Sequence, residues 1–385
     1  MECLGITTCS SEICFVNVTL ANIPGLNSLL ALSTTISTGK VLFRESASNP
    51  IVWTFGRFLT GFSIIGIFIV VESWLNDRAN NRTRGQLLSI YMFVTFVTLA
   101  SGSLLLNFSS PEKYEPFILI SLLLSLALVP ILLTKRKAPK FKKLGFLTIK
   151  NLYKISPLAA VSMFCNGFIH SAIFTLTAVY AATMNFTIFE ISLLIFLISF
   201  SGGIFQWPIG FFSDKNDRRM IIIVCTFAAS IFCVLAIIAS GTSLENMYLA
   251  SSVGVDKIMF FIYATLYAGM ALPLFTLTLA YINDYIPKEK FVAAGAGLQI
   301  IFGIGAMLGP IVCTLLMTKY GTNGFFIHLF IFHVLIGLFG MFRITKRPYK
   351  DNPESTFTPL PRNITPLGIE LDPTTGADIS NPEKK

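Results

Sequence analysis

The charged residues of this chain gather in short turns between long apolar stretches. The turn ESWLNDRANNRTRGQ, residues 72–86, carries five charges, and so does the turn GFFSDKNDRR, residues 210–219. Carboxylates in such turns can accept hydrogen bonds from the N-terminus of a neighbouring helix, and the arginines can pair with acids. We therefore predict that these turns form an inner gate, which holds one end of a helical bundle closed and releases it. The alternative is a solvated loop with no special role.

The candidate gate residues come from these two turns and from a fainter copy at 283–284. They are Glu72, Asn76, Asp77, Arg78, Arg82, Arg84, Gly210, Asp214, Arg218, Arg219, Asn283 and Asp284. Gly210 lacks a Cβ and would let another part of the chain approach closely. Asp214 is the predicted acceptor at that point.

Two further residues have side chains whose chemistry is out of place in an apolar helix. Arg57 lies seven residues after Pro50, about 10 Å below the outer boundary at 1.5 Å per residue. A charge at such a depth costs about 2.5–3.5 kcal/mol, so Arg57 should face a polar interior, unless it snorkels to the headgroups. Glu72 is about 22 Å further along the same helix and cannot neutralise it. His170 is a candidate for proton relay, or else a neutral packing residue.

The composition requires that these residues be positioned by membrane helices. The 385 residues are 54% hydrophobic and 13% charged, and the mean hydropathy is +0.71. Crossing a bilayer takes about 20 apolar residues per helix. The predicted spans are 50–71, 87–106, 115–134, 155–180, 187–212, 220–241, 257–282, 291–316 and 323–345. A weaker tenth candidate at 13–38 gives a prediction of about ten spans in an all-α polytopic protein.

The net charge of +9 is an orientation signal. Lys and Arg concentrate in alternate loops, above all in 135–154, and this bias is typical of cytoplasmic loops. It predicts a cytoplasmic C-terminus and contacts with the lipid bilayer, and it gives no reason to expect a nucleic-acid partner. The seven scattered cysteines indicate neither a disulfide framework nor a metal site.

Motifs of enzymes and ATP-driven pumps are absent from the sequence. There is no G-x-x-x-x-G-K-[ST], no H-E-x-x-H and no G-x-S-x-G. We therefore expect no catalytic residues and no cofactor, and we do not expect an enzyme. A polytopic membrane enzyme remains the less favoured alternative.

An internal repeat divides the chain into two halves. Asn76-Asp77 recurs as Asn283-Asp284, an offset of 207, and the same offset carries Gly102 onto Gly309. The predicted domains are an incomplete half of about four spans at 1–134, a basic linker at 135–153, a six-span half at 154–347 and a disordered cytoplasmic tail at 348–385. The tail is rich in proline and shows no periodicity.

These features resemble the major facilitator superfamily, and specifically its YcaD-like branch of bacterial transporters. The GFFSDKNDRR turn looks like the superfamily's G-x-x-x-D-R/K-x-G-R-R signature, with Asp217 in place of the glycine. The stretch from RFLTGFSIIG, residues 57–66, into the turn at 72–86 is similar to the branch's own pattern. The resemblance covers about residues 40–347. The first-half copy of the signature, expected at 3–12, is absent, as if the first two spans were lacking.

The resemblance implies a secondary transporter of a small solute in the bacterial inner membrane, working by alternating access as a monomer. It suggests substrate or proton coupling for Arg57, and protons are a possible second partner. The motif GIGAMLGP, residues 303–310, looks like an exporter motif but lies in the second half. The helix-packing and hinge candidates are Gly61, Gly303, Gly305, Gly309 and Pro310. A transport-incompetent homologue or a receptor is the alternative function.

Overall fold

The computed structural model describes residues 50–78, 84–108, 115–132, 147–241, 257–346 and 357–372, and all regular elements in these ranges are helical. The helices are α3 (Pro50–Arg78), α4 (Arg84–Gly102), α5 (Glu115–Leu132), α6 (Ile149–Ile155), α7 (Pro157–Thr183), α8 (Ile188–Lys215), α9 (Arg218–Ala239), α10 (Lys257–Ala271), α11 (Leu274–Asn283), α12 (Phe291–Tyr320), α13 (Gly324–Lys346) and α14 (Pro366–Glu370). A 3-10 turn, η2 (Ser103–Asn107), follows α4.

The helices confirm the all-α polytopic membrane architecture. Seven stretches of the described residues are long and apolar enough to cross a membrane, and the last, Lys288–Lys346, contains both α12 and α13. α5 contributes a shorter apolar stretch, Ile118–Ala127. The nine stronger predicted spans all fall on helices, and the tenth, at 13–38, lies outside the described residues.

The chain divides into two compact units. Unit 1 comprises Met1–Asn80 and Phe108–Lys142, with α3 and α5 as its described helices. Unit 2 comprises Asn81–Asn107 and Lys143–Lys385. This division differs from the predicted boundary at 134, because α4 packs on α8 and so belongs to unit 2.

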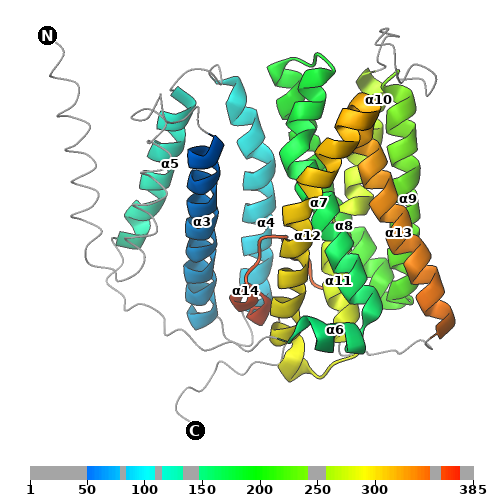
Figure 1. Cartoon of the computed structure of the whole chain (residues 1–385). Coiled ribbons are helices and arrows are strands. Elements are labelled where there is room, and N and C mark those ends of the chain that lie inside the picture. The colour runs from blue at the N-terminus through cyan, green and yellow to red at the C-terminus, as the bar shows by residue number, and fades with distance from the viewer. Residues whose placement is uncertain are drawn as a thin grey trace, which may run out of the picture. The chain divides into compact units, whose positions relative to one another are not determined.

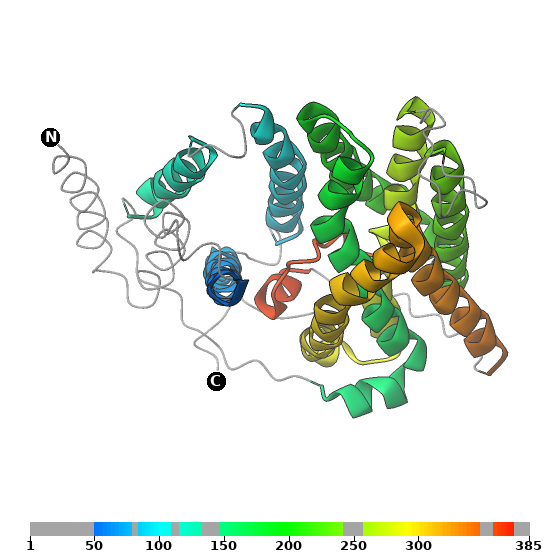
Figure 2. The same ribbon diagram turned by 45° about the horizontal axis from the view of Figure 1, so that its top comes forward.

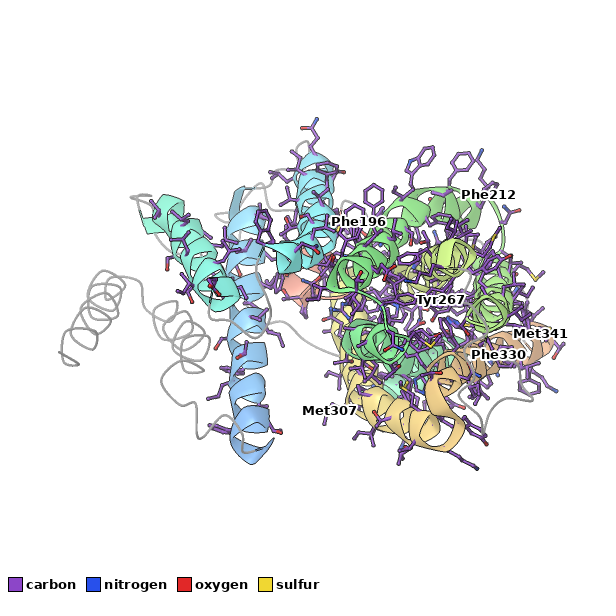
Figure 3. All side chains as sticks on the ribbon, turned by 90° about the horizontal axis from the view of Figure 1, so that it is seen from above. Phe196, Phe212, Tyr267, Met307, Phe330 and Met341 are labelled. Carbon is purple, nitrogen blue, oxygen red and sulfur yellow. The ribbon has the colours of Figure 1, made fainter. Side chains whose placement is uncertain are left out.

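Unit 2 is a bundle of long helices around a buried centre (Figures 1 and 2). α7 packs on α12 and α13, while α9 packs on α10 and α13. Seen from above, Tyr267 points into the bundle, whereas Phe212, Met307 and Met341 lie on its rim (Figure 3). Tyr267 is buried and the three rim side chains are exposed. An apolar rim of this kind is what a lipid-facing bundle requires.

The tightest helix crossing in unit 2 joins α7 to α12. A Cβ on Gly305 would collide with the carbonyl oxygen of Phe164, and a Cβ on Gly309 with the backbone of Phe168. Gly167 of α7 approaches the α12 backbone in the same way. Small residues permit such close backbone contact between membrane helices. Gly61 and Gly303, predicted to have the same role, have nothing within 4 Å.

Proline affects the spans in two ways. Pro208 and Pro310 lie inside α8 and α12 without ending them. At Pro273, in contrast, the predicted span 257–282 separates into α10 and α11. Proline lacks the N–H that would continue the helical ladder, so one helical hydrogen bond is missing at each of these positions.

Two predicted segments prove more ordered than the sequence suggested. The end of the linker forms α6, capped by Thr148 and anchored by the fully buried Leu152. The prediction of a disordered tail is wrong over residues 357–372, which pack on unit 2 and include α14. The physical reason is burial of a set of apolar side chains that interrupt the polar tail: Leu360, Ile364, Leu367, Ile369 and Leu371.

The glycines of α12 give a matched stability test. Gly305→Ala should force α7 and α12 apart and destabilise the bundle by about 1–3 kcal/mol, the usual cost of overpacking. Gly303→Ala, two residues away and facing open space, should be neutral or stabilising, because alanine favours helix by about 1 kcal/mol. Thermal unfolding of both purified variants measures the difference. Equal midpoints would contradict a backbone contact at Gly305.

Candidate functional site

The predicted gate residues of the second half meet at one end of unit 2, which we call the basic end. α8 ends there at Lys215, α9 begins at Arg218 and α11 ends at Asn283. In Figure 1 this is the lower end of the bundle, where α6 lies across the ends of the longer helices. The helices therefore bring Asp214, Arg218 and Asp284 together from three separate elements.

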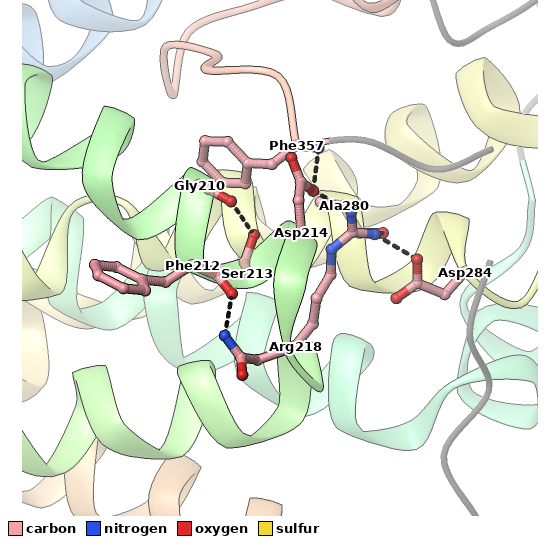
Figure 4. Close-up of polar contacts among 9 residues, drawn as sticks. Gly210, Phe212, Ser213, Asp214, Arg218, Ala280, Asp284 and Phe357 are labelled. Carbon is pink, nitrogen blue, oxygen red and sulfur yellow. Dashed lines mark hydrogen bonds and ion pairs between the residues drawn. The ribbon is translucent and has the colours of Figure 1, made fainter. Parts of the chain in front are cut away.

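Arg218 is buried at the centre of this cluster (Figure 4). Its guanidinium pairs with Asp214, at 2.7 Å, and with Asp284, and it donates to the carbonyl oxygen of Ala280 at 3.1 Å. The Arg218 side chain is 6% exposed and that of Asp284 is 9%. Burial of an arginine at this depth requires such partners, because an unpaired buried charge is very costly. The pairs connect α8, α9 and α11 of one bundle.

Asp214 and Gly210 contact a partner that the sequence did not predict. Asp214 was expected to accept a hydrogen bond from the N-terminus of a neighbouring helix. Instead the backbone N–H of Phe357 donates to Asp214 at 2.7 Å, and the Phe357 ring covers Gly210 so closely that a Cβ there would collide with it. Figure 4 shows this contact beside the arginine cluster. The C-terminal segment therefore occupies the acceptor and the close-approach position of the turn.

Asp217 and Arg219 form a separate local pair. Asp217 caps α9 by accepting from the Arg219 N–H at 2.9 Å, and its carboxylate pairs with the Arg219 guanidinium at 2.6 Å. A side chain that caps a helix satisfies one of its free N–H groups. This role explains how an aspartate can stand where the superfamily signature has glycine.

A polar contact joins η2, the turn that follows α4, to α8 far from the basic end. Asn107 donates to the Ser192 hydroxyl at 2.7 Å, and Ser103 donates to the Ser192 carbonyl at 3.1 Å. Further along the same seam, the Phe96 ring packs on Gly203, where a Cβ would lie 3.2 Å from it. We call this contact the α4–α8 seam. It joins a helix of the first sequence half to one of the second.

Three amide and hydroxyl side chains were missed by the sequence analysis. Gln206 of α8, Thr276 of α11 and Gln299 of α12 all hydrogen-bond to the backbone of residues 357–372. Gln206 and Thr276 are buried, at 3% and 1% exposure. The signal available in the sequence was a glutamine within an apolar span, at QWPIG, residues 206–210.

His170 lies in the middle of α7 and is buried. Its ring meets the Phe302 ring edge-on, with centroids 5.6 Å apart. Neither of its ring nitrogens makes a hydrogen bond of normal geometry with a described residue. The His170 imidazole is therefore surrounded by aromatic side chains.

The remaining predicted residues fall mainly in unit 1 and the turn after it. Glu72 is buried in α3. Arg57, Asn76, Asp77 and Arg78 lie in α3 and Arg84 begins α4, but their side chains are outside what the structure describes, and so is the whole of Arg82. Asn283 and Asp284 end α11. The described residues include no group of three or more His, Cys, Asp or Glu that could hold a metal ion.

The buried pair gives a prediction with an internal control. Asp284→Asn leaves the Arg218 charge partly uncompensated and should lower the free energy of unfolding by up to about 3–5 kcal/mol. Asp217→Asn should cost no more than about 1 kcal/mol, because asparagine also caps helices and the Asp217 carboxylate is more exposed than that of Asp284, at 22% against 9%. Denaturant unfolding of the two purified variants measures this. Similar losses would contradict the central role of the Arg218–Asp284 pair.

The family model and the related proteins all indicate the same family. The sequence model of the Major Facilitator Superfamily matches residues 25–275 and 248–374. A 277-residue alignment, covering 71% of this chain and 68% of the relative, is 25% identical to the "uncharacterized MFS-type transporter YcaD" of Escherichia fergusonii. An MFS-type transporter of Yersinia enterocolitica is 26% identical over the same shares, and YcaD of Escherichia coli is 23% identical.

No solved structure shows a significant match. The family model covers well over half of the sequence, and the relatives carry the name of transporters. Together with the membrane-length helices of the described residues, these matches support a multi-pass membrane transporter that acts on a small molecule in a lipid environment. The chain belongs to the major facilitator superfamily.

Proposed function

We propose that the chain is a secondary transporter that moves a small polar solute by alternating access, as a monomer in a bacterial inner membrane with its C-terminus in the cytoplasm. The family membership supports transport, and the relatives from Escherichia and Yersinia support the bacterial membrane. The basic loops support the orientation. Under this orientation the basic end of unit 2 faces the cytoplasm.

The α4–α8 seam is the observation that carries the mechanism. Alternating access requires a contact between the two halves that closes one end while the other opens. The hydrogen bonds from Ser103 and Asn107 to Ser192 join the halves at the end away from the basic turns. In this proposal they form an outer gate, and their breakage accompanies opening to the outside.

The basic end would form the complementary inner gate. The Arg218 cluster holds α8, α9 and α11 as one body, so that Asp214 and Gly210 can present a fixed surface. A fixed surface of this kind can make and break contact as a unit when a bundle tilts. Glu72, Asn76, Asp77, Arg78, Arg82 and Arg84 are proposed as its first-half counterpart.

Proton coupling is proposed to involve His170 and Arg57. His170 is a buried imidazole in the middle of a span, and histidine is the side chain whose ordinary titration lies near neutral pH. Arg57 is a charge placed within α3. Ionisable residues within membrane spans commonly mark substrate or proton pathways.

Cross-linking the seam tests the outer gate. Proteoliposomes are first screened with a panel of radiolabelled small polar solutes to find protein-dependent flux. In a cysteine-free background, Asn107→Cys with Ser192→Cys, joined by a short bis-methanethiosulfonate reagent, should stop this flux, and reductant should restore it. Each single variant treated alike is the control. Full flux in the cross-linked double variant would contradict opening at the seam.

Substitution of the intramembrane residues tests coupling. Arg57→Ala should reduce the same flux by about tenfold or more, as expected for loss of a charged contact, whereas Arg343→Ala at the end of α13 should not. His170→Gln should flatten the dependence of flux on pH. Unchanged flux in Arg57→Ala removes that residue from the mechanism, and an unchanged pH profile removes His170.

A further inference from the structure

The C-terminal segment 357–372, which we call the strap, packs on the longer helices of unit 2 through apolar contacts. Leu360, Ile364 and Ile369 are buried, and the Ile369 side chain reaches α12 so closely that a Cβ on Gly295 would collide with it. Figures 1 and 2 both show α14 beside α12. Asn363, between two of these buried residues, is exposed. The strap therefore has one face toward the bundle and one away from it.

Polar side chains of three spans hydrogen-bond directly to the strap backbone. Gln206 accepts from the Leu360 N–H at 3.2 Å, and Thr276 donates to the Leu360 carbonyl at 2.9 Å. Gln299 donates to the carbonyl of Ile364. Thr276 and Gln206 also lie within 3.4 Å of each other, so the two form a small site that recognises both polar atoms of one peptide residue. Buried polar groups need such partners.

Two further contacts anchor the first part of the strap. At the basic end, Phe357 holds Asp214 and Gly210. Further along, the Arg362 guanidinium stacks on the Phe174 ring of α7, with 3.4 Å from its central carbon to the ring centroid. Burial lowers the pKa of Arg362 to about 10, so the side chain remains a cation at neutral pH. One segment thus contacts α7, α8, α11 and α12 together.

We propose that the strap is a built-in competitor of the transported solute. The strap occupies the polar side chains Gln206 of α8, Thr276 of α11 and Gln299 of α12, and it must leave them during each transport cycle. This inference rests on the proposed transport function. The Gln206–Thr276 site then favours solutes with an N–H donor next to a carbonyl acceptor, as in amino-acid amides and short peptides. While Phe357 lies on Gly210, no other part of the chain can approach that glycine, so the seated strap also keeps the inner gate from closing.

The tether of the strap is short. The strap is joined to α13 through residues 347–356, a connection that spans at most about 35 Å when extended. Such a short tether keeps the local concentration of the strap in the millimolar range. Weak docking is then sufficient for occupancy, and a solute of moderate affinity can displace the strap.

Thiol labelling tests whether the strap is seated, without any need for transport. In the full-length chain with its native cysteines replaced, Leu360→Cys should react with a membrane-impermeant maleimide at least about tenfold more slowly than Asn363→Cys. Adding Gln206→Ala with Thr276→Val should bring the Leu360→Cys rate close to that of Asn363→Cys. Thr226→Val, whose hydroxyl bonds to carbonyls of its own helix α9, is the control and should leave the protection intact.

A peptide with the sequence of residues 355–372, added in excess, should also accelerate labelling of Leu360→Cys. Equal rates for Leu360→Cys and Asn363→Cys in the otherwise unsubstituted chain would show that the strap is not seated. Protection that survives Gln206→Ala with Thr276→Val would show that the proposed site does not hold it. If the peptide leaves the labelling rate of Leu360→Cys unchanged, the strap does not exchange with a competing ligand, and this part of the proposal is wrong.

Flux measurements test the inhibitory role separately. Leu360→Asp should release the strap and raise solute flux in proteoliposomes severalfold, whereas Asn363→Asp at the exposed position should leave it unchanged. If labelling shows that the strap has left in Leu360→Asp but the flux is unchanged or lower, the strap does not inhibit transport. Absence of flux in every chain contradicts the transporter itself and the inhibitory role with it, while labelling still decides whether the strap is seated.

Discussion

The burial of one positive charge governs the organisation of the basic end. Arg218 is removed from water where α9 begins, and its guanidinium finds partners in Asp214 of α8, in Asp284 at the end of α11 and in the Ala280 carbonyl. Charges buried in this way fix geometry because each departure leaves a group uncompensated. The ends of three helices are therefore held in register, and the strap is anchored to a surface whose shape is already set.

Much of the architecture could be predicted because membrane helices leave a strong sequence signal. Apolar runs of about 20 residues are sufficient to locate the spans, since the bilayer forbids most other structures. The 207-residue offset related Asp284 to Asp77, and the turn at 210–219 singled out Asp214 and Arg218 before any contact was known. The structure brings Asp214, Arg218 and Asp284 together within one bundle.

The strap could not be predicted in this way because it has no long apolar run, and because the residues that hold it lie in distant spans. Proline and polar residues dominate the tail. Leu360, Ile364, Leu367 and Leu371 do recur at helical spacing, but the prolines at 361 and 366 stand among them and argue against one continuous helix. Its hydrogen bonds go from side chains of distant spans to its backbone, which no motif encodes. The glycines posed a similar problem: Gly303 and Gly305 are indistinguishable in sequence, and only the position of α7 determines which of them is in contact.

The crossing of α7 and α12 limits how unit 2 can change shape. Since the two backbones touch at Gly167, Gly305 and Gly309, neither helix can slide or turn without the other, and they must travel as a single stiff pair. Flexibility has to be found elsewhere in the bundle. The discontinuity at Pro273, between α10 and α11, is a place where one half of a span can pivot while its other half stays with the Arg218 cluster.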